Sequence, residues 1–349
     1  MTTTTPPATP LTMPPTMPPT TSTLPATPTA TSTSTSTAMM RAISQDSLGG
    51  PERLRLVEVE RPVPGPSEVL VRVRAVGLNP TDWKHRAMPG FLGKLPLVLG
   101  WDVSGVVEAV GLGVTIHEVG DEVFGMLPYP YGHGSCAEYV TAPARVLVHK
   151  PAELDHAQAG AIPLAALTAY QALVDTADVR AGQRVLIHAA AGGVGHFAVQ
   201  IAKSLGVYVI GTASAAKHDL LRGLGADELI DYHHEDFERA AGGVDVVIDP
   251  IGGDYTTRSL RTLRPGGVLV SLALTETRPM PQEAAGRGVH HRLMLVEADQ
   301  AGMLAVAELA RTRRLRPVIE AAFPWEEAAK AHAVGDGGRV TGKLVLTVG

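Results

Sequence analysis

Residues 184–206 place a strand, a tight turn and a helix in immediate succession. Residues 185–187, Val-Leu-Ile, form the short apolar run that a strand buried on both faces requires. Residues 189–195 are alanine, glycine and one valine, so the turn carries almost no side chain. Apolar residues then recur at helical spacing until Gly206, at Phe197, Val199, Ile201, Ala202 and Leu205. The stretch predicts the first unit of a parallel α/β domain.

The turn itself predicts a site for a dinucleotide. A pyrophosphate at a helix N-terminus needs bare backbone N–H groups, and Gly192, Gly193 and Gly195 remove the Cβ atoms that would hold it away. The usual G-x-G-x-x-G pattern is incomplete, because Ala190 stands at its first glycine, and an ordinary Gly/Ala-rich turn is the alternative. The strand pattern that follows at 207–211 favours dinucleotide binding. The residues expected at the pyrophosphate are Ala191, Gly192, Gly193, Val194 and Gly195.

The end of the second strand indicates which dinucleotide. An NAD site places Asp or Glu about 20 residues past the glycines to bind the ribose 2′-hydroxyl. Here residues 211–217 carry no carboxylate, and the first one appears only at Asp219. Ser214 and Lys217 suit a 2′-phosphate instead, so NADP(H) is the predicted cofactor. A solvated lysine in the first turn of a helix is the alternative interpretation of Lys217.

Strand and helix patterns alternate from residue 184 to about 272. This alternation predicts a parallel, doubly wound sheet, in which right-handed crossovers bring the carboxyl ends of the strands to one side. Ligands bind at that side. The residues predicted to lie there, at or just past strand ends, are Ser214, Tyr232, Asp249 and Leu272.

The flanking segments have different patterns. Residues 41–151 contain many short alternating strands punctuated by Gly and Pro, which predicts a partly open antiparallel barrel. Residues 157–176 predict a helical connection to the nucleotide domain. After about residue 287 the pattern predicts two helices and a terminal strand over 342–348, which we expect to return and complete the first domain. His233, His234, His290 and His291 are interpreted as loop or helix-start residues, and no metal site is predicted.

The composition predicts a disordered tail and argues against several classes of protein. Residues 1–38 are almost wholly Thr, Pro, Ser and Ala without charge, which predicts a disordered tail. Upstream sequence translated from a misassigned start, or a mucin-like stalk, are the alternatives. The formal charge of −5 argues against nucleic acid as a partner. No run approaches ~18 apolar residues, so we expect no membrane span and a cytoplasmic location. The single cysteine, Cys136, excludes an internal disulfide.

Several motifs together resemble the medium-chain dehydrogenase/reductase superfamily over residues 40–349. Within it the chain is similar to the zinc-free quinone oxidoreductase and enoyl reductase branch. The resemblance implies a GroES-like catalytic domain over 39–159, an NADP-binding Rossmann domain over 160–291 and a return to the catalytic domain over 292–349. The motifs that carry it are 77–84 (GLNPTDWK), 99–105 (LGWDVSG), 134–140 (GSCAEYV), 163–170 (PLAALTAY), 188–195 (HAAAGGVG) and 342–346 (GKLVL).

The chain departs from zinc-dependent members of that superfamily at their metal ligands. A cysteine ligand of those relatives is replaced by Asn79, and their Gly-His-Glu stretch is replaced by Gly-Trp-Asp over residues 100–102. Reduction of a simple carbonyl would lack its Lewis acid. Reduction of a double bond conjugated to a carbonyl needs only hydrogen-bond donors and an acid. The resemblance therefore implies a zinc-independent, NADPH-dependent reductase of quinones or α,β-unsaturated carbonyl compounds.

The same resemblance assigns three catalytic candidates. Asn79 and Thr168 match positions that hold the nicotinamide ribose and line the active site, and Lys84 matches a candidate proton donor of polyketide enoyl reductases. An exposed lysine in a loop-to-helix turn is the alternative for Lys84. Tyr232 matches a position near the 2′-phosphate. The alternatives for function are a polyketide-pathway enoyl reductase, a redox-neutral cyclase and a non-catalytic NADPH-binding protein. The expected partner is a small-molecule substrate, and relatives are often homodimers.

Overall fold

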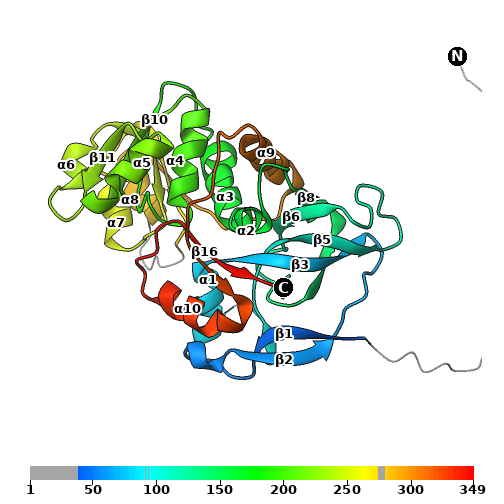
Figure 1. The fold of residues 1–349 in the computed structure, drawn as a ribbon. Coiled ribbons are helices and arrows are strands. Elements are labelled where there is room, and N and C mark those ends of the chain that lie inside the picture. Colours follow the sequence, from blue (N-terminus) through cyan, green and yellow to red (C-terminus); the bar gives the residue numbers. More distant parts are fainter. Residues whose placement is uncertain (1–37, 91, 93, 274–279) are drawn as a thin grey trace, which may run out of the picture. The chain divides into compact units, whose positions relative to one another are not determined.

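The computed structural model of the chain describes residues 38–90, 92, 94–273 and 280–349, so the tail predicted over 1–38 lies outside the described residues except for its last position. The described residues form one compact unit that contains three sheets (Figure 1).

The predicted doubly wound sheet is present as six parallel strands in the order β11-β10-β9-β12-β13-β14. In Figure 1, α4 and α5 lie against this sheet. The order reverses beside β9, which puts the glycine turn at the point where a parallel sheet opens for ligands. The strands are β9 (Arg184–Ile187), β10 (Tyr208–Ala213), β11 (Glu228–Asp231), β12 (Val244–Asp249), β13 (Leu263–Ser271) and β14 (His290–Leu293), and the helices are α4 (Gly195–Ser204), α5 (His218–Leu224), α6 (Phe237–Ala240), α7 (Asp254–Ser259) and α8 (Met280–Gly286).

The predicted barrel is a mainly antiparallel sheet in the order β15-β16-β3-β5-β6-β8, with β7 paired to β3. Its last strand in the chain, β16, is antiparallel to β3, so residues 343–347 complete a sheet that begins about 270 residues earlier. The strands are β3 (Glu68–Leu78), β5 (Asp102–Val110), β6 (Glu122–Met126), β7 (Tyr139–Pro143), β8 (Leu147–His149), β15 (Ile319–Pro324) and β16 (Lys343–Thr347).

A third sheet has the strand order β2-β1-β4. The remaining helices join or flank the sheets. Buried aromatic side chains, among them Trp101, Phe124, Phe197 and Trp325, fill the cores. The elements are β1 (Met39–Gln45), β2 (Arg55–Glu60), β4 (Leu97–Val98), α1 (Pro80–Ala87), α2 (His156–Gly160), α3 (Pro163–Tyr170), α9 (Gln300–Arg311), α10 (Ala328–Asp336), a π-helical segment (Gln171–Thr176) and short 3-10 turns at Pro51–Arg53, Ala144–Val146, Ala215–Lys217 and Trp325–Glu327.

Three local predictions differ from the structure. The helical stretch 157–176 is divided at Pro163, because proline lacks an N–H and starts a new helix at its first position. His290 and His291 lie on strand β14 and not in a loop, since they pair with Val268 and Leu269 of β13. Strand β14 runs to Leu293, so the nucleotide sheet crosses the boundary predicted after residue 291.

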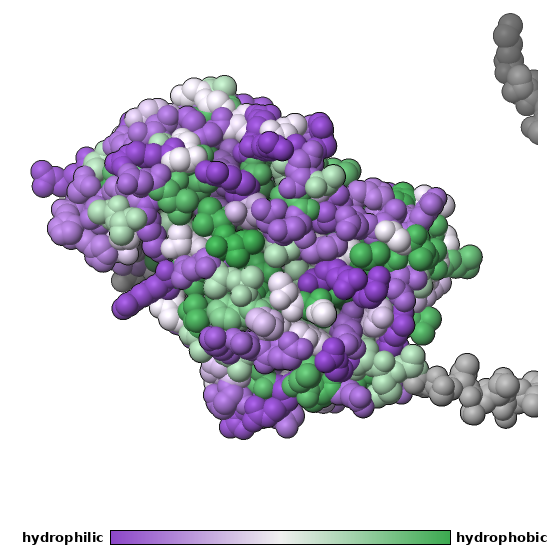
Figure 2. Space-filling view, in the orientation of Figure 1, coloured by the Kyte–Doolittle hydropathy of each residue, from purple (hydrophilic) through white to green (hydrophobic). Residues whose placement is uncertain are grey.

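Among the described residues, no helix is long and apolar enough to cross a membrane. On the face shown in Figure 2, hydrophilic side chains cover most of the surface, and hydrophobic residues gather near its centre.

Gly195 is required where helix α4 crosses the preceding strand. A Cβ at this position would lie 2.3 Å from the Ala189 carbonyl oxygen and 2.7 Å from the Cα of Ala190, both backbone atoms. A Cβ at Gly193 would lie 3.5 Å from its nearest neighbours, which is ordinary contact. The close approach predicted for Gly195 is thus present, and the requirement does not extend to Gly193.

We therefore expect Gly195→Ala to lower the free energy of unfolding by about 1–3 kcal/mol, the usual effect of overpacking. Gly193→Ala is the matched control and should change it by less than about 0.5 kcal/mol. Urea denaturation of the two variants beside the wild type measures both. Equal stability of the two variants would show that the helix moves away from the strand without penalty.

Candidate active site

The glycine turn is held open by its own backbone. Ala189 adopts a left-handed conformation, with φ of +47°, and the Ala190 N–H donates to the Thr212 carbonyl of β10 at 3.0 Å. Gly192 and Gly193 are half-buried, and helix α4 begins at Gly195. The turn fits a pyrophosphate, because no side chain caps the N-terminus of the ten-residue helix α4.

The C-terminal return segment packs against this turn. The Gly342 N–H donates to the Ala191 carbonyl at 2.8 Å, and the Val318 N–H donates to Nε2 of His196 at 3.2 Å. Nδ1 of His196 then carries the proton and donates to the Gly192 carbonyl at 2.9 Å. Burial lowers the pKa of His196 to about 4, so the ring is neutral at physiological pH and can serve both bonds.

Lys343, the first residue of β16, runs from this turn into the barrel domain. Its ammonium donates to Oδ1 of Asn79 and lies 3.3 Å from Oδ2 of Asp102. Asn79 completes the triangle, since its Nδ2 donates to the same Asp102 oxygen at 2.9 Å. All three side chains are at most 2% exposed. A buried cation therefore joins the last strand to two positions in the barrel domain that are far away in sequence.

The triangle reaches Thr168 through one backbone residue. The Leu164 N–H donates to the second Asp102 oxygen, Oδ1, at 2.6 Å, and the Leu164 carbonyl accepts a bond from the Thr168 hydroxyl at 2.6 Å. Asn79 and Thr168, both predicted from the sequence, are thus connected by hydrogen bonds through Asp102 and Leu164. Reasoning from the sequence gave neither Asp102 nor Lys343 a place in the active site.

Two carboxyl groups near Asn79 have perturbed ionisation. Burial raises the pKa of Asp102 above its ordinary value, and the Lys343 ammonium opposes that shift. Burial also raises the pKa of Asp82 to about 7, although its Oδ2 accepts the Asn79 N–H at 2.7 Å. Both acids keep α1 and β5 oriented around Asn79, and Asp82 caps the start of α1.

The residues around Asn79 and Asp102 do not fit a zinc ion. Trp101 is fully buried and donates its indole N–H to the Pro130 carbonyl at 3.2 Å, so it offers no ligand atom. The remaining oxygen donors, Asn79 Oδ1 and Asp102 Oδ2, already surround the Lys343 ammonium. A dication there would displace or oppose a buried positive charge.

The strand ends on the nucleotide side carry the predicted 2′-phosphate residues. Ser214 follows β10 directly, and the Lys217 ammonium donates to the Arg339 carbonyl at 3.2 Å. The first acid beyond the strand, Asp219, is exposed and pairs with Arg222 at 2.7 Å. Arg339, which the sequence analysis did not single out, is an exposed residue whose backbone carbonyl lies beside Lys217. The hydroxyl of Ser214 and the ammonium of Lys217 are groups that suit a phosphate.

The other predicted contacts have distinct surroundings. Tyr232 is 46% exposed just past β11, and Leu272 donates its N–H to the Asp249 carbonyl at 2.9 Å. Asp249 is fully buried, and its carboxylate accepts bonds from Ile251, Gly252 and Thr256. The Asp249 carboxylate therefore orders the loop after β12, and its predicted place at the cofactor stays a prediction.

Lys84 lies exposed on α1, while Asp82, His85 and Arg86 of the same helix are buried. The structure does not join it to the Lys343–Asp102–Asn79 network by any hydrogen bond or ion pair among the described residues. Its predicted role as a proton donor stays a prediction.

Removing the Lys343 ammonium should leave an unpaired buried carboxylate. We expect Lys343→Met to lower the free energy of unfolding by about 3–5 kcal/mol at pH 8. Lys330→Met, which removes the cation of an exposed pair with Glu327, is the control and should cost less than about 1 kcal/mol.

The loss in Lys343→Met should shrink as the pH falls. Without the ammonium the folded-state pKa of Asp102 rises further above its unfolded value, so the folded variant binds a proton that the unfolded chain releases. Urea denaturation at pH 8 and pH 5 measures the change. A loss that is independent of pH would mean that packing, and not the carboxylate, explains the effect.

Comparisons with known proteins agree with the fold described above. Residues 65–152 match the alcohol dehydrogenase GroES-like domain, and residues 224–346 match a zinc-binding dehydrogenase domain. The chain resembles a quinone oxidoreductase structure from Coxiella burnetii, with a TM-score of 0.85 and 37% identity over 89% of this chain and all of that one.

Curated relatives point the same way. The chain is 35% identical to a 2-haloacrylate reductase of a Burkholderia species, over 85% of this chain and 96% of that protein. It is 33% identical to the mitochondrial NAD(P)H oxidoreductase RTN4IP1 of Danio rerio, over 81% and 84% of the two chains. It is also 40% identical to a segment of the spectinabilin polyketide synthase protein NorB of Streptomyces orinoci, of which it spans 13%. The chain therefore belongs to the medium-chain dehydrogenase/reductase family, in its quinone oxidoreductase branch, and is an oxidoreductase that uses a nicotinamide cofactor.

Proposed function

We propose that this protein is a zinc-independent, NADPH-dependent reductase of activated double bonds, in quinones or other α,β-unsaturated carbonyl compounds. The observation that supports the proposal is the buried Lys343 ammonium, which contacts Asp102 and also Asn79, the residue that the resemblance matches to a cysteine ligand of zinc-dependent relatives. A substrate whose charge spreads over a conjugated system needs hydrogen-bond donors and an acid rather than a strong Lewis acid.

The bound nicotinamide would supply hydride to the β carbon of such a substrate. The chain would supply the rest. The half-buried glycine turn and α4 would hold the pyrophosphate, and Ser214 with Lys217 would hold the 2′-phosphate. Asn79 and Thr168, fixed by the Lys343–Asp102 network, would line the reacting end of the cofactor. Lys84, which is exposed, would deliver a proton to the α carbon or stabilise the enolate oxygen.

A polyketide-pathway enoyl reductase is the second candidate. The 40% identity to a segment of the polyketide synthase protein NorB favours it, and the substrate would then be an enoyl thioester. A redox-neutral cyclase, a non-catalytic NADPH-binding protein, a cytoplasmic location and a homodimer stay predictions. Strand β14 forms one edge of the nucleotide sheet, where such a dimer would form.

A panel of substrates tests the proposed reaction. The chelator-treated protein would be mixed with NADPH and a quinone, an α,β-unsaturated ketone, an enoyl thioester or a saturated aldehyde, and NADPH oxidation would be followed by absorbance. We expect oxidation with at least one of the first three and none with the aldehyde. Activity on the aldehyde alone would contradict the proposal. So would activity on the other substrates that is present before chelator treatment and absent after it. Oxidation with the thioester alone would select the enoyl reductase.

The preference for NADPH has its own test. Lys217→Glu should raise the KM for NADPH about tenfold or more, because a charge-assisted bond to the 2′-phosphate is replaced by repulsion. The KM for NADH should change less than about twofold. Arg222→Glu, a charge reversal on the next helix at a residue paired with Asp219, is the matched control and should leave both values near wild type. An equal rise for both cofactors in Lys217→Glu would show that Lys217 does not read the 2′-phosphate.

A further inference from the structure

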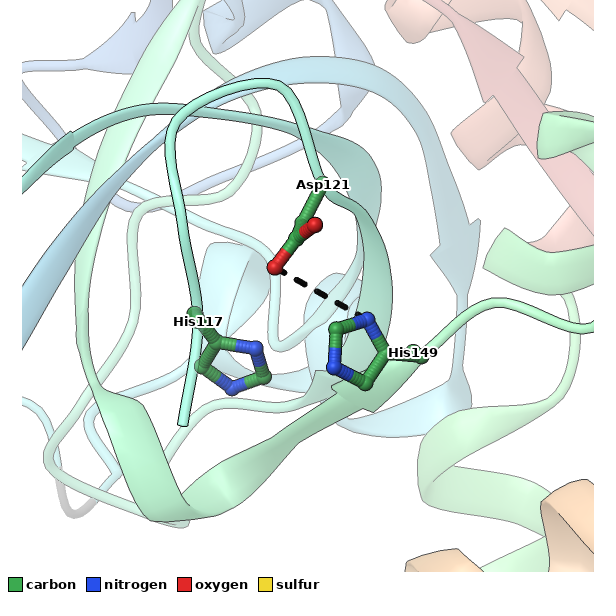
Figure 3. A group of neighbouring side chains, drawn as sticks. All are labelled: His117, Asp121 and His149. Atoms are coloured by element: carbon green, nitrogen blue, oxygen red, sulfur yellow. Dashed lines mark ion pairs between the residues drawn. The ribbon is translucent and has the colours of Figure 1, made fainter. Parts of the chain in front are cut away.

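Three side chains at one end of the barrel sheet converge outside the site described above. His117 and Asp121 belong to the loop between β5 and β6, and His149 is the last residue of β8. Strands β6 and β8 are antiparallel, with Val123 opposite His149, so the register fixes Asp121 close to His149. One ligand atom from each residue lies within 4.8 Å of the other two. Figure 3 shows the three side chains pointing toward one another.

His117 is poised as a metal ligand by its hydrogen bonding. The residue is 5% exposed, and its Nε2 lies 3.0 Å from the Ala144 carbonyl. A carbonyl only accepts, so Nε2 carries the proton and the neutral ring has its lone pair on Nδ1. That Nδ1 is buried and has no hydrogen-bond partner in the described part of the chain. Metal-binding histidines in proteins commonly donate their second ring N–H to a carbonyl in this way.

Asp121 and His149 can adjust around this fixed ring. The Glu118 N–H donates to Oδ2 of Asp121 at 2.8 Å and orients the carboxylate. Nδ1 of His149 lies 3.9 Å from Oδ2 of Asp121, and the His149 side chain is 63% exposed. Ligand atoms around a tetrahedral zinc ion are about 3.3 Å apart, as follows from Zn–N distances near 2.0–2.1 Å. Rotation of the exposed His149 ring would bring its ligand nitrogen most of the way from the observed 3.9 Å to this spacing.

We propose that His117 Nδ1, Asp121 and His149 form a binding site for one zinc-type divalent transition metal ion, with water as the fourth ligand. Two imidazoles and one carboxylate select such an ion over Mg²⁺ or Ca²⁺, which prefer oxygen ligands. The ion would relieve the unpartnered Nδ1 of His117. It would also tie the loop that precedes β6 to the end of β8.

The site shares no residue with the Lys343–Asp102–Asn79 network, and the proposal does not rest on the proposed reductase activity. Its role is structural, because the ligands come from a loop and a strand end of the barrel and not from the strand ends that face the nucleotide. Zinc bound here would leave the reaction independent of the metal.

Calorimetric titration of the full, chelator-treated and desalted protein with ZnCl₂ tests the proposal. We expect one strong Zn²⁺ site per chain and no binding of Mg²⁺ at the same concentration. His149→Gln and Asp121→Asn should each weaken Zn²⁺ binding at least about tenfold. Both side chains are partly or largely exposed, so these variants should fold even if His117→Gln does not. His234→Gln, which removes an exposed histidine paired with Asp231, is the matched control and should keep wild-type affinity.

A second readout reports the ligands themselves. Co²⁺ in the wild type should give the intense visible absorption of a four-coordinate site, and His149→Gln should lose it. Wild-type affinity in both His149→Gln and Asp121→Asn, equal binding of Mg²⁺, or no stoichiometric Zn²⁺ binding by the wild type would each overturn the proposal.

Discussion

The ion pair between Lys343 and Asp102 is the interaction on which the arrangement of the candidate site depends. Both side chains are at most 2% exposed, so each charge has lost most of its hydration. Attraction across 3.3 Å offsets that loss only if the remaining polar atoms are also bonded. Asn79 and the Leu164 N–H meet this requirement, because they bond the two oxygens of the carboxylate. The network therefore holds the terminal strand, the barrel and helix α3 in one geometry.

The same network also places a positive charge beside Asn79 in the candidate site. A lysine ammonium carries one positive charge on a strand that also contacts the glycine turn through Gly342. Its position is set by backbone pairing of β16 with β3, and not by coordination chemistry. The cation beside Asn79 and Asp102 is thus a side chain of the protein itself. The cluster proposed as a metal site, His117, Asp121 and His149, lies apart from this network, at the β6–β8 end of the barrel.

Much of the fold followed from periodicity and turn residues. The apolar run at 185–187 is a central parallel strand, and the long barrel strand β3 lies in the stretch of short strands predicted over 41–151. Errors arose where local pattern was ambiguous. Pro163 divides a stretch that is helical in composition throughout, and the paired histidines 290 and 291 carry no apolar signal for the edge strand that they form. An edge strand forms because it pairs with the adjacent strand, so its own residues predict it poorly.

The sequence by itself determined the nucleotide cradle, because its three glycines, the strand before it and the helix after it are contiguous and act through the backbone. It also marked Asn79 as a candidate site residue. Only the tertiary structure decided what stands beside Asn79, since Lys343 is 264 residues away and Asp102 is 23 residues away. The motif GKLVL predicted the terminal strand but not which residues its lysine, Lys343, contacts. Side-chain contacts between distant strands depend on register and sheet order, which local spacing does not encode.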